Sequence, residues 1–240
     1  MEAKYKKVLI KISGEALAQG MKEDEKNIYN FDVLEDICSQ IKKCVAMGVG
    51  VGIVVGAGNI WRGAKQGRNM ERNRADHMGM LATVINCLAL QNTLETLGVE
   101  SVVMTTAQMP TFAKYFNIED AKKYMSEGKV LIFGCGTGSP FFSTDTGAVL
   151  KAAELGVDAV LFAKNIDGVY TADPKKDANA KKLEKITYTE ILTNGLEVMD
   201  LAAAAFCRTN NLTTVVFGLN EKASIERVVC GDTLGTLVTV

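Results

Sequence analysis

Apolar runs alternate with amphipathic segments along most of this chain. Runs at 7–12, 50–55, 101–105, 129–133 and 158–163 have the length of buried strands. Between them, apolar residues spaced three and four apart predict helices at 31–47, 77–97, 118–127 and 146–155. This order predicts an α/β fold, a three-layer α/β/α sandwich around a mainly parallel sheet.

The last third of the chain continues the pattern with shorter elements. Strands are expected at 185–188, 213–217 and 236–240, and helices at 189–194, 200–210 and 223–229. No internal repeat, low-complexity stretch or linker interrupts residues 1–240, so we expect one continuous domain.

The predicted helix at 77–97 is apolar around most of its circumference. Such a helix must be buried on more than one side, so it either lies at the centre of the core or forms a subunit interface. Asp76, just before it, has two interpretations that are compatible: it caps the helix, or it accepts hydrogen bonds from the hydroxyls of a ligand.

Residues 134–145, GCGTGSPFFSTD, join the strand at 129–133 to the helix at 146–155. Backbone N–H groups and the helix dipole favour an anion at such a turn, and glycines let a ligand approach closely. The alternatives are a phosphate or nucleotide pocket and an ordinary glycine-rich connection.

Two further glycine turns follow strands. Lys11 stands near the end of the first strand, just before Gly14, where it either meets a phosphate or lies at a sheet edge in solvent. The second strand leads into GAGN at 56–59, and Arg62 follows, placed either to bind phosphate or to lie exposed. The basic stretch 65–74 is expected to be a solvated loop or a lid over phosphates.

Composition excludes several classes of function. The 240 residues are 48% hydrophobic and 23% charged with a net charge of −1, so nothing indicates nucleic acid or an anionic membrane as a partner. Six scattered cysteines and one histidine do not suggest zinc and are typical of reduced thiols in a cytoplasmic protein. The charged N-terminus leads straight into a strand, and no apolar run is long enough to span a membrane.

The sequence also lacks several catalytic signatures. It has no Walker lysine motif, no dinucleotide G-x-G-x-x-G after a strand and no G-x-S-x-G elbow. What remains is a set of glycine turns with lysine, arginine and aspartate nearby. That inventory suits phosphoryl transfer, which needs positioning and charge neutralisation rather than a nucleophilic side chain.

Six motifs follow one another along the chain and together resemble those of the bacterial uridylate kinases, a branch of the amino acid kinase fold family. They are KISGEA at 11–16, GAGNIWRG at 56–63, DHMGMLA at 76–82, TGSPFFSTD at 137–145, DGVYTADP at 167–174 and VMDL at 198–201. The resemblance covers essentially the whole chain. It implies transfer of the γ-phosphoryl of ATP to UMP with Mg²⁺, a homohexamer, UTP as feedback inhibitor and a cytoplasmic place in pyrimidine biosynthesis.

The resemblance also implies roles for single residues, with no residue assigned as a metal ligand. The catalytic set would be Lys11, Arg62, Asp145 and Asp200, the two aspartates orienting Lys11 or the metal. The ATP site would comprise Lys11, Ile12, Ser13, Gly14, Gly58, Arg62, Asn165, Tyr170 and Asp173, with either Lys164 or Asn165 at the adenine. The UMP site would comprise Ala57, Asp76, Thr137, Gly138, Ser139, Pro140, Phe141, Phe142, Ser143 and Thr144. We expect the N-terminal part to carry mainly the UMP site and the C-terminal part mainly the ATP site.

The chain departs from the family pattern at a few positions. Ala57 replaces a frequent glycine, Ser139 a frequent asparagine and Ser143 a frequent threonine. Residues 19–24 lack the Gly-x-Gly usual in the family's GTP-activation segment. Two other hypotheses are a related kinase acting on a carboxylate or carbamate, and a nucleotide sensor without catalysis. The Phe141–Phe142 pair argues against the first, because it suits a base, and the retained charged residues argue against the second.

Overall fold

The computed structural model describes residues 2–21, 27–61, 69–172, 174, 177, 179–196 and 198–240. Among them, helices and strands alternate as the sequence predicts. The strands of the first part are β1 Lys7–Ile12, β2 Gly50–Val55, β3 Ser101–Thr105, β4 Lys114–Tyr115 and β5 Val130–Gly134. Those of the second part are β6 Ala159–Lys164, β7 Val169–Tyr170, β8 Lys182–Leu183, β9 Lys185–Thr187, β10 Thr214–Gly218 and β11 Thr236–Thr239.

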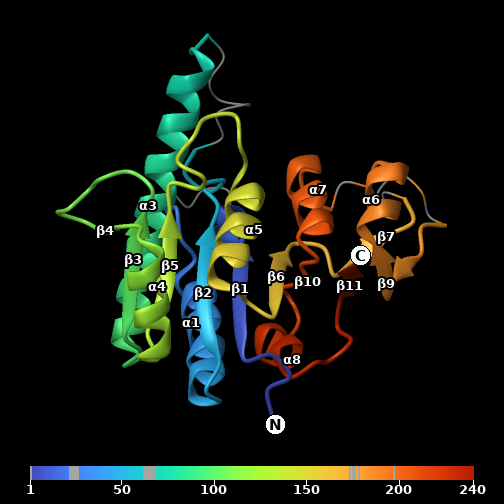
Figure 1. Ribbon diagram of the computed structural model, residues 1–240, viewed down its shortest axis with the longest axis horizontal. Helices are drawn as coiled ribbons and strands as arrows, with labels where there is room; N and C mark the ends of the chain where they lie inside the picture. The colour runs from blue at the N-terminus through green and yellow to red at the C-terminus, as the bar shows by residue number, and fades with distance from the viewer. Residues whose placement is uncertain are drawn as a thin grey trace.

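The helices cover both faces of the sheet (Figure 1). They are the 3₁₀ helix η1 Gly14–Ala18 and the α-helices α1 Phe31–Ala46, α3 Arg72–Thr96, α4 Ile118–Ser126, α5 Thr144–Leu155, α6 Tyr188–Asn194, α7 Leu201–Thr209 and α8 Ser224–Val229. None of the helices in the described part of the chain is both long and apolar enough to cross a membrane.

Within the described residues, nine strands form one sheet in the order β4-β3-β5-β2-β1-β6-β10-β11-β9. Its pairs are parallel except β10 with β11, so the expected mainly parallel sheet is confirmed. β7 and β8 form a separate antiparallel pair. β1 lies inside the sheet between β2 and β6. The chain runs from β1 to β2 on one side, whereas from β6 it continues to β9, β10 and β11 on the other side. Ligands bind outside the carboxyl ends of strands at such a place.

Alternation along β1 divides the core into two layers. Val8, Ile10 and Ile12 pack into the cluster shared with α1, α3 and α8, whereas Leu9 packs into the cluster shared with α4, α5 and α7. Because side chains of a strand alternate between faces, Lys11 points to the same face as Leu9. That face is covered by α5, whose first residues follow the loop after β5.

The long helix α3 differs from the sequence prediction at its start. It begins at Arg72, with Glu71 in the N-cap position, so the interpretation of Asp76 as the cap is wrong: Asp76 lies in the second turn. Residues 72–76 are polar apart from the buried Ala75, and helical periodicity of apolar residues begins only after them. These turns need little apolar surface because this end of α3 projects beyond the sheet (Figure 1).

Three other N-caps fix the elements around the candidate site. Asn30 caps α1, Ser143 caps α5, and Asp200 caps α7. Each of these side chains accepts a hydrogen bond from an otherwise unpaired N–H of the first turn. The caps of α5 and α7 therefore place Asp145 and Asp200 at neighbouring helix N-termini.

Candidate active site

A buried ion pair stands where the central strand meets α5. Lys11 Nζ lies 2.6 Å from Asp145 Oδ1, and Lys11 is only 8% exposed. Lys11 comes from the interior strand β1, and Asp145 is the second residue of α5. This excludes the alternative in which Lys11 lies at a sheet edge in solvent.

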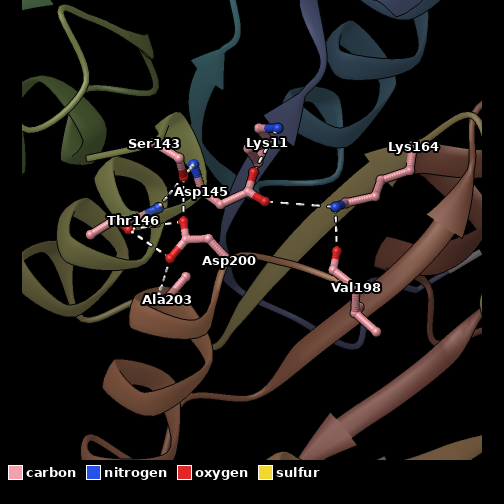
Figure 2. Close-up of polar contacts among 8 residues, drawn as sticks. All are labelled: Lys11, Ser143, Asp145, Thr146, Lys164, Val198, Asp200 and Ala203. Carbon is pink, nitrogen blue, oxygen red and sulfur yellow. Dashed lines mark hydrogen bonds and ion pairs between the residues drawn. The ribbon is translucent and has the colours of Figure 1, made fainter. Parts of the chain in front are cut away.

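A second lysine shares the same carboxylate (Figure 2). Lys164, at the end of β6, places Nζ 3.6 Å from Asp145 Oδ2 and also donates a hydrogen bond to the carbonyl of Val198. Burial lowers the pKa of Lys164 below the ordinary lysine value, and the attraction of Asp145 offsets only part of this. Sequence reasoning left Lys164 as a possible adenine contact; its ammonium is instead directed at Asp145.

Asp145 is anionic in this arrangement. Burial alone would raise the pKa of its carboxyl, but the charges and hydrogen bonds of Lys11 and Lys164 outweigh burial and hold the pKa below its ordinary value. One carboxylate therefore keeps two ammonium groups in place at the carboxyl edge of the sheet. The group carries a net charge of +1 and is suited to an incoming anion.

Asp200 lies next to Asp145 and contacts two hydroxyls and a helix N–H. Its carboxylate accepts hydrogen bonds from the hydroxyls of Ser143 and Thr146 (Figure 2). The Thr146 hydroxyl lies 3.1 Å from Oδ1 and 2.9 Å from Oδ2 of Asp200, and the Ala203 N–H donates to Oδ1 at 2.8 Å. These contacts join the N-termini of α5 and α7. Asp145 is the carboxylate in contact with Lys11, whereas Asp200 holds the helix that carries Asp145.

The two glycine turns expected to hold a triphosphate pack against each other. A Cβ on Gly14 would lie 2.5 Å from the Gly58 nitrogen and 2.6 Å from the Gly56 oxygen, so only glycine fits there. Ser13 lies between the buried Ile12 and Gly14, and its buried Oγ has no hydrogen-bond partner among the described residues. An unsatisfied hydroxyl beside a glycine turn is available to a ligand.

A pocket lies beside these turns, between α3 and the loop after β5. Asp76 faces this loop, and its Oδ2 accepts 2.8 Å hydrogen bonds from the Phe141 N–H and from Arg72 Nε. Burial acts to raise the pKa of Asp76, but these bonds and the charge of Arg72 outweigh it and hold the pKa below its ordinary value. Phe141 has a φ of 72° and Cys135 a φ of 66°, conformations that are strained for non-glycine residues.

Most residues of the predicted UMP site line this pocket. Those on its wall are Ala57, Asp76, Thr137, Ser139, Phe142, Ser143 and Thr144. Gly138, Pro140 and Phe141 belong to the same loop and are not on the wall. The wall also contains residues that sequence reasoning missed: Ala75, Gly79, Met80, Thr83, Cys135 and Gly136. The spacing of those in α3, one helical turn apart, was the signal that could have found them.

The predicted adenine contacts follow Lys164 along the chain. Asn165, the next residue, is exposed, and Tyr170 donates a 2.9 Å hydrogen bond from its hydroxyl to Asp167 Oδ1. Lys182 binds the other oxygen of Asp167 at 3.0 Å. Arg62, Asp173, residues 22–24 of the GTP-activation segment and residues 65–68 of the basic stretch lie outside the described residues.

The residues present do not fit a resident metal ion. Asp145 is shared by two lysines and Asp200 by two hydroxyls and a helix N–H. Among the residues that the structure describes, no three histidine, cysteine or acidic side chains converge as ligands would. Mg²⁺ is commonly held by one or two carboxylates together with substrate phosphates. A magnesium ion at this place would therefore need the phosphates of a ligand to complete its coordination.

Two solved structures resemble this chain over nearly its whole length. The first, a UMP kinase from Bacillus anthracis, is 37% identical with a TM-score of 0.92, and the match covers 98% of this chain and 96% of that one. The second, a UMP kinase from Ureaplasma parvum, is 38% identical with a TM-score of 0.91, covering 98% and 99%. A uridylate kinase from Archaeoglobus fulgidus, 23% identical with a TM-score of 0.73 over 96% of this chain and 99% of that one, shares the fold.

A family comparison agrees with these structural matches. Residues 6–218 match the sequence profile of the Amino acid kinase family, from the first residues before β1 to the end of β10. The matched region contains Lys11, Asp145, Lys164 and Asp200, as well as both glycine turns. The chain therefore belongs to the amino acid kinase family.

Proposed function

We propose that this protein is a UMP kinase, which transfers the γ-phosphoryl of MgATP to UMP and yields UDP and ADP. The observation that carries this is the largely buried group of Lys11, Asp145 and Lys164, together with the two glycine turns and the pocket around Asp76. The two UMP kinases that match at 37% and 38% identity over nearly the whole chain support the same substrate.

The donor and acceptor sites meet at Thr144. A Cβ on Gly56, in the turn proposed for ATP, would lie 3.6 Å from Thr144 Oγ1, and Thr144 also lines the pocket proposed for UMP. We place the ATP phosphates on residues 12–14 with Gly58 and Arg62. UMP lies on Ala57, Asp76 and the loop 137–144, with its ribose hydroxyls on Asp76. The reacting phosphates then lie next to the lysine cluster.

The chemistry in this arrangement is charge neutralisation. A phosphate oxygen of UMP is already anionic near neutral pH, so it can attack the γ-phosphorus without a base. The bond between the γ-phosphorus and the oxygen that bridges it to the β-phosphorus breaks, and negative charge moves onto that bridging oxygen. Lys11 and Lys164 stabilise the transferring phosphoryl group, and Asp145 keeps both ammonium groups aimed at it. Mg²⁺ supplies further positive charge on the phosphates of ATP.

The remaining assignments follow the two sides of the molecule. We place adenine near Tyr170, Asn165 and Asp173, so the C-terminal part of this one domain carries mainly the ATP site and the N-terminal part mainly the UMP site. Lys164 serves the phosphates rather than adenine, because its ammonium contacts Asp145.

We also infer a homohexamer. On α3, Met78, Leu81 and Ile85 form an apolar face that is 38%, 52% and 47% exposed, which a partner subunit would cover. By the same family resemblance, UTP is the feedback inhibitor and the enzyme acts in the cytoplasm in pyrimidine biosynthesis, with neither nucleic acid nor a membrane as partner.

Release of ADP in a coupled assay tests the proposed substrate. ATP is offered with UMP, CMP, acetylglutamate or carbamate, and Lys11→Ala serves as the control for contaminating kinases. UMP should give the highest kcat/KM by a wide margin. Turnover of acetylglutamate or carbamate above that of UMP would instead identify a kinase acting on a carboxylate or carbamate.

A further inference from the structure

Helix α3 carries two buried polar side chains one turn apart. Thr83 is 3% exposed and Asn86 is fully buried. They lie three positions apart, so they share a face of the helix. Each makes hydrogen bonds to a different one of the two loops that the proposed reaction must bring together.

Thr83 holds the acceptor loop, defined here as residues 135–144. Its Oγ accepts a 2.8 Å hydrogen bond from the Cys135 N–H and donates one of 2.6 Å to the Met80 carbonyl. Cys135 is the residue whose φ is 66°. The hydrogen bond from the Cys135 N–H to Thr83 therefore stabilises the strained backbone conformation at the first residue of the loop.

Asn86 holds the donor turn, defined here as residues 56–59. Its Nδ2 donates to the Gly56 carbonyl at 2.7 Å and to Asn59 Oδ1 at 2.8 Å. Its Oδ1 accepts from Asn59 Nδ2 at 3.1 Å and from the Tyr29 hydroxyl at 2.9 Å. All four hydrogen-bonding positions of this amide are thus used, three of them on the donor turn.

The network around Asn86 reaches the first glycine turn as well. A Cβ on Gly14 would lie 2.6 Å from Asn59 Oδ1, so the Asn59 side chain rests directly against Gly14. Asn59 also donates a 2.9 Å hydrogen bond to the Ile28 carbonyl. Burial raises the pKa of Tyr29 to about 12, with a smaller contribution from Cys87, so its hydroxyl stays a donor at neutral pH.

We infer that Thr83 and Asn86 are positioning residues that tie the two substrate sites separately to one rigid helix, Thr83 setting the binding of UMP and Asn86 that of ATP. This rests on the proposed UMP kinase function. Because an intact α3 fixes the spacing of its two side chains, it also fixes the spacing of the two loops. Loss of either side chain should change the KM of one substrate much more than that of the other, although Ala57 of the donor turn also lines the UMP pocket.

Steady-state kinetics of Asn86→Ala and Thr83→Val, with each substrate varied at saturating concentration of the other, test this inference. Asn86→Ala should raise the KM for ATP about fivefold or more and leave the KM for UMP within about twofold, because Gly56 and Asn59 lose buried partners. Thr83→Val keeps the shape but loses the hydroxyl, and should show the opposite split. Thr83→Ser, which retains the hydroxyl, should restore the KM for UMP.

Thr93→Val is the matched control. Thr93 lies on the same helix, and its Oγ1 donates to the Ala89 carbonyl at 3.0 Å without touching either loop. Both KM values should be unchanged. If Asn86→Ala does not fold, Tyr29→Phe replaces it, since it removes one hydrogen bond to Asn86 and should raise the KM for ATP about fivefold and the KM for UMP by less than about twofold.

The outcomes separate this inference from the proposed function. A wild-type protein that does not phosphorylate UMP would overturn the function itself. With an active wild type, equal changes in both KM values, or a lower melting temperature with unchanged KM values, would show that Thr83 and Asn86 only stabilise the fold, and the inference would be wrong.

Discussion

Replacing Asp145 by asparagine should damage both stability and activity. The variant keeps the shape of the side chain but leaves Lys11 and Lys164 facing each other in a buried site without their shared anion. Asparagine can accept a hydrogen bond from one ammonium, yet it supplies no charge. The two lysines would then repel each other or turn away from the reacting phosphates.

The magnitude follows from the two distances. At 2.6 Å and 3.6 Å, and with an effective dielectric constant of about 20, the attractions amount to about 6 and about 5 kcal/mol before the cost of burying the charges is subtracted. Removing one partner of a buried pair typically costs about 3–5 kcal/mol of the free energy of unfolding. In a chain of this size that corresponds to a melting temperature lower by about 10 °C.

Urea unfolding followed by circular dichroism measures the stability, and the coupled assay measures the rate. Glu119→Gln is the control, because it makes the same chemical change in an exposed pair with Lys122 at 4.0 Å, where no measurable effect is expected. The kcat of Asp145→Asn should fall about 100-fold or more, since no carboxylate then holds the Lys11 ammonium toward the transferring phosphoryl group.

The pH dependence provides an independent check. The folded state lowers the pKa of Asp145, so its stabilising contribution is complete above its unfolded pKa of about 4 and is lost as the pH falls through the lower folded value. The stability gap between wild type and Asp145→Asn should thus be constant from about pH 5 to neutrality and shrink below about pH 4. Equal stability of the two proteins at neutral pH would refute the reasoning.

Three further substitutions test single roles. Lys11→Ala should lower kcat about 100-fold or more at saturating substrate, and a near-normal rate would reject Lys11 as the group that stabilises transferred charge. Asp76→Asn should mainly raise the KM for UMP, by about tenfold, since the carboxylate receives the ribose and fixes the Phe141 N–H; an effect confined to ATP would mean that the two sites are exchanged. Because burial lowers the pKa of Lys164, the wild-type kcat should decline with rising pH below the ordinary lysine value of about 10.4, as the ammonium is lost. Lys164→Arg stays charged and should lack that decline in a pH–rate profile, and an unchanged alkaline limb would assign it to another group.

The sheet could be predicted because its strands are buried on both faces and stand out as apolar runs. The strands at 7–12, 50–55 and 101–105 have the predicted bounds. By contrast, β4, β7 and β8 contain two residues each and were missed. So short a strand is defined by the partner it meets and has no periodicity of its own.

The start of α3 and the residues it contributes to the site were harder to foresee. Its first turns are mostly polar and project beyond the sheet, so hydrophobic periodicity could not place Arg72 as the first residue. Thr83 and Asn86 look like ordinary helix residues in the sequence. Their importance comes from loops that reach them from positions 56 and 135, and such contacts are set by the fold.

Lys164 shows the limit of motif reasoning in the candidate site. Its position after an apolar strand was clear, but the direction of its side chain was not. The direction depends on Asp145, which approaches from another strand-to-helix connection. By contrast, the sequence alone indicated that Lys11 is either exposed or paired with an anion. A lysine within an apolar strand needs an anionic partner if that strand is central.

The position of β1 between β2 and β6 has a consequence for synthesis on the ribosome. The strands β4, β3, β5, β2 and β1 are adjacent in the sheet and all lie before residue 135, whereas β6 begins at Ala159. At ordinary rates of translation, the 30 residues from the end of β5 to the end of β6 take about two to six seconds. During that interval β1 is an open apolar edge of the nascent sheet, the kind of edge that invites aggregation. The charge of Lys11 within this edge strand discourages pairing with other nascent chains until β6 arrives.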